Sequence, residues 1–247
     1  SWRCINNFNA YQASLAMKEN PIYGWFPEEV DTHMLTNHEW GAVAYLSKSQ
    51  YGADSEVWNN SYTGFKTGCS GPSASAYSQP SCVGFEYNTE NGVKASTTHN
   101  IYGVYDMSGG AWDRVMGNYN NLVGNESGFN IEEILLMASK YITRYFTAPE
   151  DLLNGVGANY DSTIFGDGLY ETSTNPYIWN GNSWIGEPHA AWHSDYSYLP
   201  YLPSNPWLAR GCSSLYYGSS VGVFAFHPHH WHDNRQFSFR VALIPFF

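Results

Sequence analysis

The chain has 247 residues, 43% of them hydrophobic, which is enough for a substantial core in one large domain or two small ones. Charged residues make up only 13% and aromatic residues 17%, so Asn, Ser, Thr, Tyr and Gly carry most of the polarity, as is typical of extracellular, loop-rich proteins with many strands. The formal net charge of −11, with no cluster of Lys and Arg, would repel phosphate backbones and argues against nucleic-acid binding.

No apolar run approaches the roughly 18 residues that predict a membrane-spanning helix. The chain opens at Ser1 with neither Met nor the pattern of a signal peptide, which predicts a processed or trimmed ectodomain. Neither an internal repeat nor a linker marks a domain boundary. We therefore expect one domain, at the cell surface or outside the cell, with no membrane span in this chain.

The first predicted helix begins at Thr36, where residues 36–39 have the sequence of a capping box. Trp40, Val43 and Ala44 follow on one face, and Gly52 lies just beyond the expected end. An apolar stripe of this kind must face a core.

Residues 53–98 lack periodicity and are rich in small polar residues, so we expect long loops with short strands. Cys69 and Cys82 flank a Gly/Ser/Pro/Ala segment, and a disulfide between them would stabilise the fold by about 3 kcal/mol through loop closure. The alternative is two buried thiols. Cys4 either pairs with Cys212 or has lost an upstream partner.

Residues 100–113 predict a strand, a glycine turn and a second strand. Asp106 and Asp113, beside the turn, are expected to anchor loops by hydrogen bonds or to bind a structural calcium ion. A second helix is predicted from Ile131 to about Tyr145, capped by Asn130, with acidic residues in its first turn. The chain then returns to loop from 146 to 206.

The last forty or so residues contain strand-like segments at 207–211, 223–226 and 237–243, which frame two stretches without any pattern. In 237–243, the alternation predicts one face made by Phe237, Phe239, Val241 and Leu243, and another by Ser238, Arg240 and Ala242. The framed stretches are crowded with His, Tyr, Trp, Ser, Asp, Asn and Arg. Such residues on loops held by a rigid scaffold are typical of a binding surface.

The run from His227 to His232 is a natural place to suspect zinc or copper. Pro228 disturbs the spacing and only Asp233 offers a carboxylate, so we expect no physiological metal or other cofactor there, although such a run can capture metal in vitro. The candidate carboxylates show no catalytic pairing, and we expect no catalytic residue; they are Asp31, Glu39, Asp106, Asp113, Asp195 and Asp233.

Three tryptophans, Trp40, Trp112 and Trp207, are expected in the core. Arg210 is expected to satisfy buried carbonyl groups below the loops.

Residues 36–46, 100–112, 207–211 and 237–243 together resemble the formylglycine-generating-enzyme-like branch of the C-type lectin fold, with a match from about residue 31 to the end. Within that branch the chain looks most like the variable proteins of diversity-generating retroelements. In those proteins a C-terminal lectin-fold segment is mutated at template adenines to create new binding surfaces.

The resemblance implies one α+β domain over residues 1–247, in which a twisted, mostly antiparallel sheet is accompanied by two helices and long loops. It further implies a loop-rich insertion at about 118–204 and a variable segment at about 212–236. The chain would be a non-catalytic receptor or adhesin on a bacterial or virion surface, and its ligand a protein or a carbohydrate on another cell or surface.

The alternatives are a fixed-specificity lectin-like protein or a pilus or surface structural module. A cysteine-oxidising enzyme of the same branch is a further alternative. Its catalytic cysteine pair is missing here, because only Cys212 lies in that region, in place of a glycine in the usual Arg-Gly-Gly.

The residue content bears on the retroelement hypothesis, because an AAC codon randomised at its adenines never gives Lys, Glu, Gln, Met or Trp. Positions 212–217 and 227–235 obey this rule everywhere except Trp231. The expected contact residues are Ser213, Ser214, Leu215, Tyr216, Tyr217, His227, His229, His230, Trp231, His232, Asp233, Asn234 and Arg235.

Overall fold

The computed structural model describes residues 2–58, 60–61, 64–65, 86–147, 165–213, 221–228 and 236–246. Its main sheet has five strands around β4, which pairs in parallel with β10 and β5 and antiparallel with β8; β9 then pairs antiparallel with β8. The strands are β4 (Trp112–Tyr119), β5 (Thr143–Tyr145), β8 (Trp207–Arg210), β9 (Phe226–Pro228) and β10 (Phe237–Phe239).

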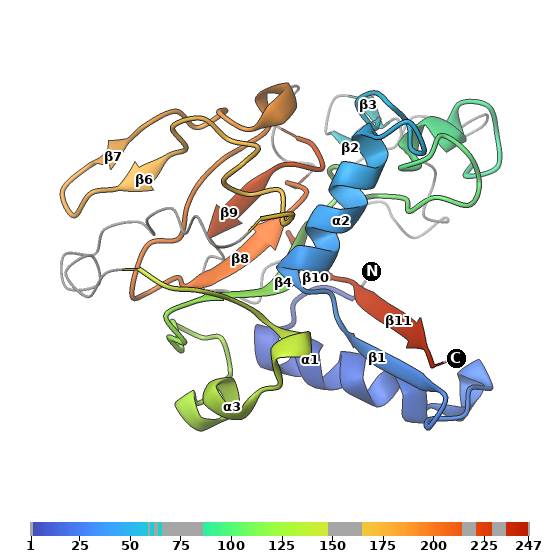
Figure 1. Cartoon of the computed structure of the whole chain (residues 1–247), viewed down its shortest axis with the longest axis horizontal. Helices are drawn as coiled ribbons and strands as arrows, with labels where there is room; N and C mark the ends of the chain where they lie inside the picture. Colours follow the sequence, from blue (N-terminus) through green and yellow to red (C-terminus); the bar gives the residue numbers. More distant parts are fainter. Residues whose placement is uncertain are drawn as a thin grey trace.

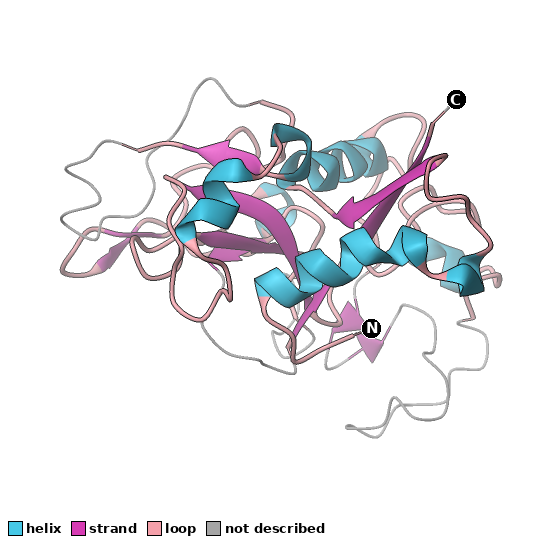
Figure 2. Ribbon diagram, turned by 90° about the horizontal axis from the view of Figure 1, so that it is seen from below, coloured by secondary structure: helices cyan, strands magenta, loops and turns pink. Residues whose placement is uncertain are grey.

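A second, two-stranded sheet joins the two ends of the chain, because β1 (Val30–Met34) pairs antiparallel with β11 (Val241–Pro245). Helix α1 (Asn7–Ala16) lies along β1, and α2 (Asn37–Lys48) rises beside the main sheet (Figure 1). Figure 2, seen from below, shows α1 in front of the strands.

The remaining elements are short. They are η1 (Met17–Glu19), η2 (Pro21–Tyr23), β2 (Asn60–Ser61), β3 (Gly64–Phe65), η3 (Gly92–Ala95), α3 (Ile131–Leu136), η4 (Ser139–Tyr141), β6 (Ile178–Trp179), β7 (Trp184–Ile185) and η5 (Trp192–Ser194). The expected mixed α+β class with mostly antiparallel pairing is confirmed, but the described residues form three α-helices and not two. None of the helices in the described ranges is long and apolar enough to cross a membrane.

Helix α2 begins where the sequence predicts. The Thr36 hydroxyl accepts a hydrogen bond from the Glu39 amide, and the Glu39 carboxylate accepts one from the Thr36 amide, which completes the capping box. Trp40 and Ala44 are fully buried, and the Trp40 Nε1–H donates to the Val223 carbonyl at 2.8 Å. The helix is therefore fixed to the segment that leads into β9.

Helix α1 was not predicted, because its sequence has no clear apolar stripe. Its buried side includes the polar residues Asn7 and Ser14. The Asn7 carboxamide accepts a hydrogen bond from Arg114 Nη1 on β4 at 2.7 Å, and the Ser14 hydroxyl donates to the Ala10 carbonyl. A tertiary hydrogen bond to β4 thus satisfies Asn7 Oδ1, while Ala10 and Tyr11 supply the apolar contacts of the helix.

The second predicted helix was right at its start and wrong at its end. Asn130 caps α3 with a capping box, but the helix ends at Leu136 and residues 143–145 form β5. Arg144 Nη2 donates to the carbonyls of Ile134 and Met137 at the end of α3. Pairing with β4 buries Tyr145, and this tertiary gain outweighs helix propensity.

Of the two strands predicted in 100–113, only the second exists. Residues 101–103 form a turn and β4 starts at Trp112.

The predicted faces of 237–243 are also wrong, since Ser238 is buried and Leu243 is 47% exposed. The reason is that this segment divides at Arg240 between two partners, β10 on β4 and β11 on β1, so one alternation cannot apply to both.

Candidate functional site

The two patternless stretches of the C-terminal region start and end at one buried cluster. Cys212, Val221 and Phe237, which flank them, pack together with Trp112 and Tyr196. These residues come from β4, from β10 and from the segments on either side of β8 and β9. The same cluster therefore supports both stretches.

Main-chain hydrogen bonds hold the bases of the stretches. The Gly211 amide donates to the Ala225 carbonyl at 3.2 Å, and the Gly211 carbonyl accepts from the Gly109 amide at 2.7 Å. On the other side, the Trp112 amide donates to the Gln236 carbonyl at 2.6 Å. Buried main-chain bonds of this kind fix the positions at which each stretch leaves and re-enters the scaffold.

Two of the expected contact residues lie in the described part of the chain, and both are buried. Ser213 is 1% exposed and His227 is 4% exposed, so neither presents a contact surface here, and their expected role is corrected to support. The other expected contact residues and the proposed disulfide lie outside the described residues; they are Ser214, Leu215, Tyr216, Tyr217, His229, His230, Trp231, His232, Asp233, Asn234 and Arg235, with Cys69 and Cys82.

His227 is buried by aromatic rings. Its ring centroid lies 5.3 Å from that of Trp112, 5.5 Å from Tyr196 and 5.4 Å from Tyr198. Its main chain belongs to β9, opposite Ala209 of β8. Sheet register thus turns the side chain of this first histidine into the aromatic cluster and away from solvent.

Arg210 performs the role predicted for it. The side chain is fully buried, and Nη2 donates to the Gly168 carbonyl at 2.8 Å, while Nη1 donates to the Asp167 carbonyl at 3.4 Å and to Asn37 Oδ1 at 3.2 Å. It connects β8 to the start of α2 and to the loop at 165–169. The expected core positions of Trp40, Trp112 and Trp207 are likewise confirmed, since each is at most 2% exposed.

A second buried polar group lies beside Arg210. The Asp167 carboxylate accepts hydrogen bonds from the Tyr145 hydroxyl and from Asn37 Nδ2. Burial raises the pKa of Asp167, although the Tyr145 hydrogen bond and the Arg210 charge act in the opposite direction. The result is a network linking α2, β5, β8 and the 165–169 loop under the main sheet.

Asp195 lies beneath the segment that leads into β9. Its side chain is 1% exposed; Oδ2 accepts a hydrogen bond from the Phe224 amide at 2.9 Å, and Oδ1 has no hydrogen-bond partner among the described residues. Gly222 packs directly on this carboxyl group, and an added Cβ there would overlap it. Burial raises the pKa of Asp195 well above its ordinary value, although the Phe224 amide opposes the shift.

Replacing Asp195 by Asn is expected to make the protein more stable at neutral pH. A carboxyl group with a raised folded-state pKa stabilises the fold at low pH and loses that contribution as pH rises above its unfolded pKa of 3.8. Asn keeps the acceptor for Phe224 and does not ionise. Urea denaturation between about pH 4 and pH 8 should therefore show the two curves diverging as pH rises. Parallel curves would contradict a raised pKa of the Asp195 carboxyl group.

The cysteines of the described part are both free, so the alternative in which Cys4 pairs with Cys212 is wrong. Cys4 is exposed and Cys212 is fully buried. Burial raises the pKa of the Cys212 thiol well above its ordinary value, which disfavours the reactive thiolate. Cys212 has a φ of 64°, a left-handed conformation that favours glycine.

Asp113 anchors a loop by hydrogen bonds, which is one of the two roles predicted for it. Its carboxylate pairs with Arg240 Nε at 2.5 Å, and the same guanidinium donates to the carbonyls of Tyr105 and Asp106. A cationic side chain thus occupies the position where calcium was considered. Within the described ranges, no group of three His, Cys, Asp or Glu side chains could hold a metal ion.

Sequence reasoning missed a charged cluster between β1 and α2. His33 Nε2 lies 2.9 Å from Glu39 Oε1, and Asp31 Oδ2 pairs with Lys140 Nζ at 2.8 Å. Asp31 Oδ1 also accepts from the Tyr141 hydroxyl, so both carboxylates are engaged by protein donors. The signal was the i, i+2 spacing of Asp31 and His33, which puts both on one face of a strand. We interpret this cluster as a structural contact that holds β1 against α2 and against η4.

A chain of aromatic rings in 177–201 was also missed, because the whole region was expected to be loop. From His227, rings continue through Tyr198 and Tyr177 to Trp184. Alternation of Tyr196 and Tyr198 was the available signal.

No protein-family model, curated protein or solved structure matches this chain.

Proposed function

We propose that this chain is a non-catalytic ligand-binding protein of the C-type lectin fold, in the branch that includes the variable proteins of diversity-generating retroelements. Within its segment 212–236, the stretches on either side of the buried residues 221–228 would form a diversified recognition surface, displayed on a bacterial or virion surface. The ligand would be a protein or a carbohydrate on another cell or surface.

The observation that supports this most is the common support of the two patternless stretches. Each stretch leaves and re-enters the scaffold beside the cluster that contains Trp112, and strand β9, which lies between the two stretches, is buried. A surface that tolerates many sequences needs such a base, because its own residues cannot be relied on for folding. Binding without catalysis is further supported by Cys212, whose burial and raised pKa do not suit cysteine oxidation.

Sequencing this gene across a natural population tests the proposal. Codons from Trp207 to Phe247 should differ at adenine-derived positions within 212–236, over an unchanged scaffold. Variation should spare Trp112, Val221 and Phe237, whose side chains form the base. Uniform stretches would contradict diversification and would favour a fixed-specificity lectin-like protein or a surface structural module.

Replacing Tyr217 and Trp231 together by Ala is expected to abolish ligand binding while the melting temperature stays nearly unchanged. Aromatic hot spots contribute about 2 kcal/mol each, so the pair accounts for a roughly 1,000-fold loss of affinity. Affinity is measured on a ligand recovered by a binding screen. A matched control is Trp192→Ala, since Trp192 is 43% exposed and packs on Phe224 instead. A large drop in melting temperature would place Tyr217 and Trp231 in the core.

A further inference from the structure

The β6–β7 hairpin carries a continuous group of partly exposed aromatic rings. Trp184 stacks on Tyr177 with centroids 5.2 Å apart and an interplanar angle of 7°, and Trp179 lies 5.6 Å from Trp184. Tyr198 joins from the neighbouring segment, 4.5 Å from Tyr177, and Tyr201 lies 5.7 Å from Trp179. All five are intermediate in exposure. We call these five residues the aromatic face.

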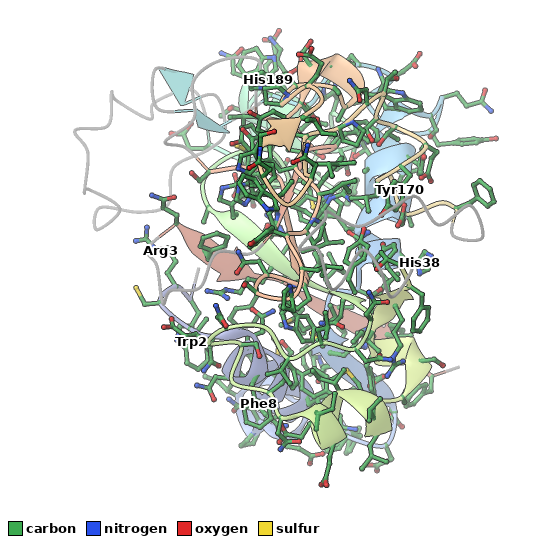
Figure 3. All side chains as sticks on the ribbon, turned by 90° about the vertical axis from the view of Figure 1, so that its left-hand side faces the viewer. Trp2, Arg3, Phe8, His38, Tyr170 and His189 are labelled. Atoms are coloured by element: carbon green, nitrogen blue, oxygen red, sulfur yellow. The ribbon has the colours of Figure 1, made fainter. Side chains whose placement is uncertain are left out.

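The aromatic face lies at one end of the molecule. The hairpin projects at the left of Figure 1, and Figure 3 looks onto that side, with His189 of the neighbouring loop near the top. Among described residues β6 and β7 pair only with each other, and a two-stranded hairpin is marginally stable alone. Contacts between the rings therefore hold the hairpin against the segment that contains Tyr198, and the rings remain partly exposed.

Hydrogen bonds hold the main chain under the aromatic face. The Tyr177 amide donates to the Ser197 carbonyl at 2.8 Å, and the Leu199 amide donates to the Tyr177 carbonyl at 3.0 Å. Asn180 Oδ1 accepts from the amides of Asn182 and Ser183, which closes the hairpin turn. A ligand that stacked on these rings would find them already ordered, so it would lose little affinity to their immobilisation.

The surroundings are polar and almost uncharged. Residues 172–204 contain only two acidic side chains, Glu187 and Asp195, and no Lys or Arg. Asp195 is buried, so Glu187 is the exposed charge of this stretch. Exposed amide and hydroxyl side chains border the rings; they include Asn175, Asn180, Asn182 and Ser183. An ionic ligand would find little to pair with here, whereas a neutral ligand with many hydroxyl groups would find both donors and acceptors.

We propose that the aromatic face is a fixed carbohydrate-binding site for neutral polysaccharide, separate from the diversified segment. The C–H groups of pyranose rings pack on the indole rings of Trp179 and Trp184, whose planes are 65° apart and so take different sugar units, and the sugar hydroxyl groups hydrogen-bond to the bordering amides. Ring contacts continue beneath the surface from Tyr198 to the buried His227 of β9, so the aromatic face rests on the same cluster that supports the diversified segment. A constant contact to a glycan surface would keep the variable segment close to its targets, because linked contacts raise the effective concentration of the second.

Affinity electrophoresis of the full chain tests the site, with laminarin, soluble starch, xylan or mannan cast into native gels. At least one of these neutral polysaccharides should slow the protein. Trp179→Ala and Trp184→Ala should weaken that binding about tenfold or more. Trp192→Ala, which removes an exposed Trp of the same region outside the aromatic face, should migrate like the parent protein. Circular dichroism and melting temperature establish that each variant is folded.

Trp179→Phe covers the case in which Trp179→Ala does not fold, since Phe keeps most of the packing and should bind with intermediate strength. Retardation by none of the four polysaccharides, or equal retardation of all variants, would overturn the site. Binding of a decaproline peptide in their place, lost on the same substitutions, would overturn it in favour of a peptide groove. The double variant at Tyr217 and Trp231 should still bind polysaccharide. If that variant alone loses it, the sugar belongs to the diversified segment and the separate site is wrong.

Discussion

Replacing Arg210 by Met is expected to lower the free energy of unfolding by about 3 to 5 kcal/mol, because it leaves buried partners of a charged group unpaired. The Arg210 guanidinium is fully buried and donates to Asn37 Oδ1 and to the carbonyls of Asp167 and Gly168. Met fills a similar volume but donates no hydrogen bond, so three acceptors lose a donor in a place that water does not reach. Urea denaturation followed by circular dichroism measures the change.

Two further variants make the Arg210 result specific. Arg210→Lys keeps the charge but lacks the planar fork that reaches several acceptors at once, so it should also be strongly destabilised. Arg3→Met, at an exposed position, should change the free energy of unfolding by no more than about 0.5 kcal/mol. A loss of less than about 1 kcal/mol in Arg210→Met would contradict the network as described.

Replacing Gly41 by Ala is expected to destabilise the protein by about 3 kcal/mol, although the same change inside an exposed helix stabilises by about 1 kcal/mol. Gly41 lies in α2, where it is buried against the 165–169 loop. A Cβ at this position would overlap the main chain of Asp167, which cannot move without disturbing its bonds to Asn37, Tyr145 and Arg210. The expected effect therefore has the opposite sign to helix propensity.

The control for Gly41→Ala is Ala42→Gly at the next, exposed position of α2. It should cost about 1 kcal/mol through propensity alone. Melting temperatures and urea midpoints of both variants separate the two effects. If Gly41→Ala equals or exceeds the parent protein in stability, α2 does not press on the Asp167 main chain.

The starts of α2 and α3 were predictable from the sequence, since a capping box involves residues only three apart. Thr36 and Asn130 both cap helices as expected. The buried Trp residues and the role of Arg210 could also be predicted, because large aromatic side chains and a lone cation between apolar strands have few other stable environments. The chemistry of the candidate site was less predictable. Ser213 and His227 matched a contact pattern in composition, yet both are buried, His227 because it belongs to strand β9 of the main sheet.

The sequence by itself determined the beginnings of α2, α3 and β4, the strand β8 and the core positions of three tryptophans. These follow from local capping and from burial of large apolar groups. Only the tertiary structure decided that α3 stops at Leu136, that β10 and β11 have different partners, and that Asp167, Asp195 and the aromatic face exist as sites. Each depends on contacts between residues far apart in the chain, and such contacts leave no periodicity in the sequence.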